Sequence, residues 1–170
     1  MPYGNNKPKY IRWLIFCALV TVSVLLQNST GGVLEFFGAR VFLSIPLCVS
    51  IAMFEREVPA ALFGVLAGLL WDVSSGVDGF NTLVLMLLCA VCSLLISHLM
   101  RNNIVTALVL GAGGTAAYEI IYFLVRFWSG GNPVIQIFKF YLPSLALTIL
   151  FIPVCYYIVK KIYFSHRIAE

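Results

Sequence analysis

Charged side chains are scarce in this chain. Only 11% of its 170 residues are Asp, Glu, Lys or Arg, whereas 61% are hydrophobic. A soluble domain of ordinary composition carries roughly 25% charged residues, so this chain has too few to cover a surface that faces water. The composition excludes an ordinary soluble domain and indicates an integral membrane protein.

Residues that carry out chemistry are also few. The sequence has two histidines, His98 and His166, and it lacks G-x-S-x-G, H-E-x-x-H and P-loop patterns. Its five cysteines lie inside apolar stretches, and Cys89-Ala-Val-Cys92 has no second pair, so we interpret them as packing residues. We therefore expect no catalytic site, no metal site, no cofactor and no enzymatic activity.

Long apolar stretches are what the chain does have. Six of them predict transmembrane helices, because a spanning helix needs ~20 mostly apolar residues. The connections are too short to hold a soluble domain, so residues 1–170 are expected to form a single transmembrane domain, an all-α, compact six-helix transmembrane bundle. The third stretch is short and could instead be a re-entrant segment. The expected spans cover residues 11–28, 33–54, 58–75, 79–98, 104–126 and 134–159.

Basic residues in the connections predict the orientation. Most of them fall on one side of the expected membrane, and this side is normally cytoplasmic. Both termini are therefore expected in the cytoplasm, with Trp13 at the inner interface and Trp71 and Trp128 at the outer one. We interpret the net charge of +4 as this topology signal and expect no nucleic-acid partner. The residues on the basic side are Lys7, Lys9, Arg12, Arg56, Arg101, Lys160, Lys161 and Arg167.

Four charged residues fall inside the expected spans, where charge is costly and is usually paired or functional. Arg40, Asp72, Glu119 and Lys139 all fall in the outer third of a ~30 Å hydrocarbon core, counted at a rise of ~1.5 Å per residue. We expect a mutually compensated intramembrane charge cluster in which Asp72 faces Arg40 or Lys139. Two interpretations stay open, namely ion pairs that fix helix register and a binding cavity open to the outer face.

Small residues predict where helices pack closely. Gly64 and Gly68 form a G-x-x-x-G row in the third span, and Gly111 and Gly114 belong to a small face of the fifth. We expect these two rows to meet, which would bring Asp72 close to Glu119. Gly76 and Gly79 predict a tight reversal into the fourth span.

Three segments give the chain a resemblance to a known family. They are "LLQNS" at the end of the first span, "FERE" after the second, and "GVLAGLLWDVSSGVDGFNTLVLMLL" through the third and fourth. In order and spacing they resemble the MreD family of bacterial rod shape-determining membrane proteins, mainly over residues 20–100. Many members carry Pro-Asp-Leu at the start of the second span. This chain reads "GARVFLSIPL" there, with Arg40 near the place of the acid.

The resemblance implies a function and a location. It implies a non-enzymatic membrane scaffold of the cell-elongation machinery in the bacterial cytoplasmic membrane. Such a scaffold binds MreC and helps to couple MreB filaments to the SEDS glycosyltransferase and the penicillin-binding transpeptidase. It also implies a fold similar to the substrate-binding S-components of energy-coupling-factor transporters.

That fold likeness supplies an alternative function, a small-molecule-binding subunit of such a transporter. These subunits typically carry an Ala-x-x-x-Ala row on the first helix, whereas Ala18 is followed by Val22 here. A pore is a third hypothesis, but it predicts a polar face along a whole helix. The charged residues of this chain concentrate at one depth instead.

Overall fold

The computed structural model describes residues 7–28, 35–36, 39–76, 79–127 and 142–165. The described part is mainly helical, and five of its helices are long and apolar enough to cross a membrane. The length and composition of these helices indicate a multi-pass helical membrane protein. The helices are α1 (Lys7–Asn28), α2 (Ser44–Ala52), α3 (Glu57–Ser75), α4 (Phe80–His98), α5 (Ile104–Phe127) and α7 (Leu142–Ser165), and the strands are β1 (Glu35–Phe36) and β2 (Ala39–Arg40).

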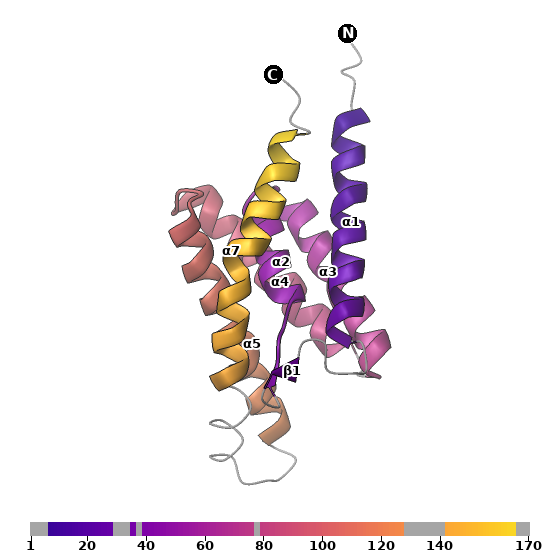
Figure 1. The fold of residues 1–170 in the computed structure, drawn as a ribbon, viewed down its shortest axis with the longest axis vertical. Coiled ribbons are helices and arrows are strands. Elements are labelled where there is room, and N and C mark those ends of the chain that lie inside the picture. The colour runs from indigo at the N-terminus through magenta and orange to yellow at the C-terminus, as the bar shows by residue number, and fades with distance from the viewer. Residues whose placement is uncertain (1–6, 29–34, 37–38, 77–78, 128–141, 166–170) are drawn as a thin grey trace.

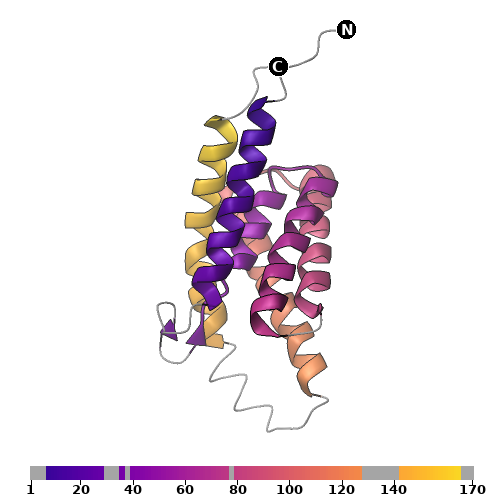
Figure 2. The same cartoon turned by 90° about the vertical axis from the view of Figure 1, so that its right-hand side faces the viewer.

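The long helices run roughly side by side, and the bundle has two distinct ends. Helix α1 begins and helix α7 ends at the same end, which we call the terminal end (Figure 1). The strands, the C-terminal end of α3 and the N-terminal end of α4 lie at the opposite end, which we call the turn end. At the terminal end, α1 and α7 extend beyond the other helices in both views (Figures 1 and 2).

The helix expected over residues 33–54 is much shorter in the structure. Strands β1 and β2 pair antiparallel with Glu35 opposite Arg40 in register, and α2 covers only Ser44–Ala52. Pro46 accounts for the late start of the helix. A proline fits the first turn of a helix, whereas in a helix interior it removes a backbone hydrogen bond and its ring clashes with the carbonyl four residues earlier, which disfavours a helix that begins much before Pro46.

Helix α2 is the core of the bundle. All nine of its residues are buried, and it contacts α1, α3, α4, α5 and α7. A helix of this length rises only about 13 Å, too short to cross a membrane alone. Irregular backbone at membrane depth is tolerated where protein surrounds it, and the five long helices provide that enclosure.

Close packing joins α3 to α4, not to α5 as expected from the glycine rows. A Cβ atom on Gly68 would lie 2.3 Å from Cα of Thr82, and one on Gly64 would lie 2.6 Å from the carbonyl oxygen of Leu85. Both glycines therefore let the backbone of α4 approach that of α3. Without them the two helices would have to separate.

The glycines of α5 face other neighbours. A Cβ on Gly111 would meet Cδ1 of Ile152 in α7 at 2.7 Å, and one on Gly114 would meet Cδ1 of Leu88 in α4 at 3.2 Å. The expectation that the two glycine rows pack on each other is therefore wrong, because the α3 row packs against α4 and the α5 glycines pack against α7 and α4.

The reversal between α3 and α4 uses both glycines that the sequence marks for it. Gly76 has φ +64° and Gly79 has φ +73°, in the left-handed region that favours glycine. Gly76 ends α3 and donates its backbone N–H to the carbonyl of Asp72. Gly79 is the N-cap of α4, and without a side chain it leaves the first N–H groups of that helix to another partner.

Candidate functional site

Asp72 supplies the missing cap of α4. Its Oδ1 accepts a hydrogen bond from the backbone N–H of Asn81 at 3.1 Å. Its Oδ2 accepts from the backbone N–H of Thr82 at 2.9 Å and from the Thr82 hydroxyl at 2.6 Å. A carboxylate is well placed there, because a helix N-terminus carries free N–H groups and a partial positive charge. Asp72 is only 5% exposed, so these bonds replace water.

The glycine row explains how Asp72 reaches α4. Gly64, Gly68 and Asp72 are spaced four residues apart, so they lie on one face of α3. The two glycines bring the helix backbones together, and the carboxylate then meets the first turn of α4 directly. The acid in the glycine row is therefore part of the same helix contact as the glycines.

A second hydrogen bond extends this contact to α5. The hydroxyl of Tyr118 donates to Oδ1 of Asn81 at 2.6 Å, and both side chains are buried. The ring of Tyr118 stacks on Trp71 with centroids 5.2 Å apart. Trp71 is buried in the bundle, so its ring packs on other helices. Its place at the level of the outer interface stays a prediction, and Trp128 lies outside the described residues.

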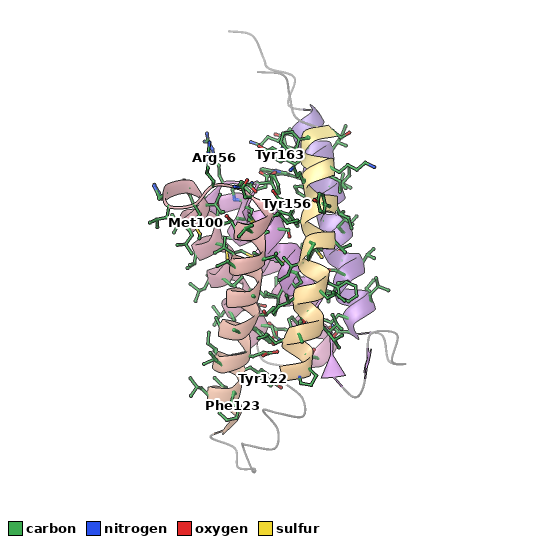
Figure 3. The ribbon with its side chains drawn as sticks, turned by 60° about the vertical axis from the view of Figure 1, so that its left-hand side comes forward. Arg56, Met100, Tyr122, Phe123, Tyr156 and Tyr163 are labelled. Carbon is green, nitrogen blue, oxygen red and sulfur yellow. The ribbon has the colours of Figure 1, made fainter. Side chains whose placement is uncertain are left out.

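Further rings surround Tyr118 and form what we call the aromatic cluster. Phe42 lies 5.5 Å from both Trp71 and Tyr118, and Tyr122 stacks on Tyr118 at 6.1 Å. Figure 3 places Tyr122 at the turn end, opposite Tyr156 and Tyr163. The cluster joins α3, α4, α5 and the segment before α2. Its members are Phe42, Trp71, Phe80, Tyr118 and Tyr122.

Helix α2 is also capped by another helix. Gln27 of α1 accepts hydrogen bonds at its Oε1 from the backbone N–H of Ser44 at 3.0 Å and from the Ser44 hydroxyl at 2.6 Å. Just before α2, the backbone N–H of Phe42 donates to Oγ1 of Thr148 in α7 at 3.3 Å. Side chains of α1 and α7 thus accept from two backbone N–H groups at and just before the start of this short central helix.

One more bond ties α1 to α3 at the turn end. The side-chain amide of Asn28 donates to the hydroxyl of Ser74. Gln27 and Asn28 belong to "LLQNS", and Asp72 and Ser74 belong to "WDVSSG". Two segments that are distant in the sequence therefore meet at one end of the bundle, where both hold helix ends.

Glu119 is the acid at this level that is least satisfied. It is 6% exposed on α5, and the Ser144 hydroxyl of α7 interacts with its carboxylate. Its Oε1 has no hydrogen-bond partner among the described residues. A buried carboxylate oxygen without a partner is costly, so Glu119 marks a place where a proton, a cation or a donor group would be stabilised.

The predicted charge cluster is described only in its acidic half. Asp72 and Glu119 lie at one level, since Trp71 stacks on Tyr118, the residue before Glu119. Lys139 lies outside the described residues, and Arg40 is described only as part of strand β2. The pairing of Asp72 with Arg40 or Lys139 thus stays a prediction, whereas its bonds to α4 are a finding.

An ion pair at the terminal end was not predicted. Nη2 of Arg12 in α1 lies 2.8 Å from Oε1 of Glu55, and both side chains are at most 10% exposed. Burial raises the pKa of Glu55 above its ordinary value of 4.5, and the positive charge of Arg12 opposes that rise. The sequence indicates Arg12 only as part of the topology signal, and nothing in its sequence neighbourhood indicates burial.

Neighbouring helices hold the short connection that carries Glu55. The Ser93 hydroxyl of α4 donates to the Glu55 carbonyl at 2.9 Å, and the Asn102 side chain donates to the Met53 carbonyl at 2.9 Å. The hydroxyl of Tyr156 in α7 donates to Oδ1 of Asn102 at 3.3 Å. This network fixes the connection between α2 and α3 from three sides.

Three of the five cysteines lie together in the core. Cys48 of α2 interacts with Cys89 of α4 and Cys155 of α7, and these three are buried in the core. Within the described part of the chain, no group of three or more His, Cys, Asp or Glu residues is arranged to hold a metal ion.

Comparisons with known proteins add no relative. No family model, no curated protein and no solved structure matches this chain.

Proposed function

We propose that the protein is a non-enzymatic scaffold of the bacterial cell-elongation machinery, of the MreD type. In this proposal it lies in the cytoplasmic membrane and binds MreC. Through MreC it helps to couple MreB filaments to the SEDS glycosyltransferase and the penicillin-binding transpeptidase. The proposal rests on the resemblance described above and on how the residues of those segments are used in the fold.

One observation supports the proposal most. The polar side chains of the two segments cap or join helices, as Gln27 does for α2 and Asp72 does for α4. Because these side chains hold the bundle together, partner proteins would contact its exposed helix faces. On α4 that face is apolar and consists of Leu83, Leu87, Val91 and Leu94. A protein that works by holding other membrane segments needs such a face on a firmly assembled bundle.

We further propose six membrane crossings with both termini in the cytoplasm. Helix α1 begins and α7 ends at the same end of the bundle (Figure 1), which supports an even number of crossings. Five long helices give an odd number, so the segment that contains α2 would make the sixth. The basic residues at the terminal end favour the cytoplasm for that end.

A second candidate function follows from Glu119. The buried Glu119 carboxylate lies beside Ser144 and has one oxygen without a partner among the described residues. A small polar or cationic ligand could bind to this oxygen. This favours the transporter alternative, a small-molecule-binding membrane subunit of the energy-coupling-factor type.

Photo-crosslinking from single positions would test the scaffold. A photoreactive residue would replace one exposed leucine at a time, Leu14 on α1, Leu87 on α4 or Leu150 on α7, in the host cell. The three sites match in residue type and exposure but point from different helices. After mild-detergent purification, each crosslinked chain would be identified.

The scaffold proposal expects MreC or a cell-wall synthase crosslinked from one position and not from the other two. Capture of ATPase subunits with a coupling membrane protein would instead support the transporter subunit. If neither set is recovered from any of the three positions, the scaffold proposal fails.

A further inference from the structure

The C-terminal end of α7 carries a doubled pattern of lysine and aromatic residues. Residues 156–164 read "YYIVKKIYF", and positions four and then three residues apart fall on one helix face. Two neighbouring rows result, each with a lysine between two aromatic rings. The rows are Tyr156–Lys160–Tyr163 and Tyr157–Lys161–Phe164.

The first row faces the bundle and positions its lysine. Tyr156 is 2% exposed, and Nζ of Lys160 lies 5.6 Å from the centroid of its ring. Arg12 of α1 packs over the ring of Tyr163, with its guanidinium carbon 4.6 Å from the ring centroid. Figure 3 shows Tyr156 and Tyr163 on α7 at the terminal end. This row therefore joins α7 to α1 and holds Lys160 over an aromatic face.

The second row faces outward and continues into an apolar stripe. Tyr157 and Phe164 are both more than half exposed, and Lys161 between them is exposed. Toward the centre of the bundle, the same face of α7 continues with Val154 and Leu150, which are also exposed. Along one helix face the surface thus passes from apolar to aromatic to basic.

Helix α1 carries another cation at the terminal end. Nζ of Lys9 lies 5.0 Å from the centroid of the Trp13 ring, so α1 repeats the combination of lysine and aromatic ring. In the described part of the chain, the ion pair at this end joins Arg12 to Glu55. Lys9, Lys160 and Lys161 are not in it. The charge of Lys9 also acts on the Glu55 carboxylate, so the charges of Lys160 and Lys161 are the ones most available to an anion.

We propose that this surface is a binding site for the head group of an anionic phospholipid. Lys160 and Lys161 bind the phosphate with help from Lys9, and the acyl chains lie along Tyr157, Val154 and Leu150. A ligand with a negative head and an apolar tail matches a surface that changes from basic to apolar along one helix. Lysine and tyrosine are also the residues that bridge the water and hydrocarbon layers of a membrane.

An acidic protein segment would be the main alternative ligand. It would use the lysines, but it would gain nothing from the exposed stripe of Leu150 and Val154 below them. The lipid uses both parts of the surface. Lys160 is also already held over Tyr156, which lowers the ordering cost of binding.

Lipid titration of the full-length protein in detergent, read by native mass spectrometry, would test the proposal. The probe is palmitoyl-oleoyl phosphatidylglycerol, and phosphatidylcholine with the same acyl chains is the matched lipid. The variant is Lys160→Gln with Lys161→Gln. Its control is Arg56→Gln with Arg101→Gln, which removes the same number of positive charges from residues outside α7.

A basic residue near an anionic lipid surface is worth about fivefold in affinity. We expect the lysine variant to bind phosphatidylglycerol about 25-fold more weakly, with phosphatidylcholine binding unchanged and the arginine variant close to the unmodified protein. Lys160→Arg with Lys161→Arg should keep the affinity. If the double lysine variant fails to fold, Lys161→Gln alone, at an exposed position, should lose about fivefold.

Three outcomes would overturn the proposal. Equal losses in the lysine and arginine variants would mean diffuse attraction by the positive end. Equal binding of the two lipids by the unmodified protein would mean that charge is not recognised. Displacement of phosphatidylglycerol by a low concentration of a polyglutamate peptide would indicate an acidic protein partner instead.

Discussion

Buried polar groups are satisfied by different interactions at the two ends of the bundle. At the turn end, Asp72, Gln27 and Asn81 take part in hydrogen bonds that cap or link helices, and both α2 and α4 begin there. At the terminal end, Arg12 and Glu55 form an ion pair, and lysines lie over aromatic rings. One end uses oriented backbone dipoles, and the other uses opposite charges.

The difference follows from where helices begin. A helix that begins among its neighbours has free N–H groups that water cannot reach, so a side chain must accept from them. Gly79 brings no such side chain to α4, and Gln27 serves α2 from another helix. At the terminal end Arg12 lies inside α1, so its charge, and not a free backbone group, is what needs a partner.

Breaking the terminal-end ion pair should have the largest effect. Arg12→Met or Glu55→Leu alone leaves one buried charge without its partner, at an expected cost of about 3–5 kcal/mol in the free energy of unfolding. The double variant should be less destabilised than either single variant, because it buries no charge. Thermal unfolding in detergent would measure all three. Two single effects that simply add in the double variant would contradict a coupled pair.

Forcing α3 away from α4 should have the next largest effect. Gly68→Ala would place a Cβ 2.3 Å from Cα of Thr82, so the backbone must shift, at an expected cost of about 3 kcal/mol. Gly113→Ala is the matched control, since a Cβ there would meet nothing within 4 Å. It should be neutral or stabilise the helix by about 0.5–1 kcal/mol. Equal stability of the two variants would show that Gly68 does not set the helix spacing.

The sequence predicts the long helices well but not the second span. The apolar composition of residues 33–54 indicates only that the segment is shielded from water. It does not distinguish a spanning helix from a short helix enclosed by others, because both are equally apolar. Pro46 was a usable signal for a late helix start. The antiparallel pairing of Glu35 with Arg40 has no comparable signal in this stretch.

For the candidate site, the sequence predicts how deep the residues lie along the bundle better than it predicts their hydrogen-bond partners. Counting residues along two helices placed Asp72 and Glu119 at one depth, and the stacking of Trp71 on Tyr118 is consistent with it. The partner of Asp72 could not be found in this way, because it is mainly backbone N–H of α4 and no residue type marks that. The position of Gly79, an N-cap without a side chain, was the indirect signal.

Asp72→Asn should have a smaller effect than the glycine substitution. The amide can still accept at one oxygen, but its NH₂ group would face an N–H of α4, at an expected cost of about 1–2 kcal/mol. Arg40→Gln in the same chain would test whether the two charges also pair. Capping alone predicts additive losses in thermal unfolding, whereas recovery in the double variant would show that Arg40 is a partner of Asp72.

The smallest effect is expected from the protonation of Glu55. Burial raises the pKa of this carboxyl above 4.5 although Arg12 opposes it, so the folded protein keeps the proton to a higher pH than the unfolded chain. The contribution of Glu55 to stability is therefore fully present below about pH 4.5 and is lost as the pH rises through the raised pKa. Unfolding midpoints between pH 4 and 7 should fall more steeply with pH in the unmodified protein than in Glu55→Gln, whatever the absolute stability of the variant. Unfolding midpoints that rise more steeply with pH in the unmodified protein would mean that the attraction of Arg12 outweighs the effect of burial on the Glu55 carboxylate. The charges at the terminal end would then stabilise the fold directly, as the helix caps do at the turn end.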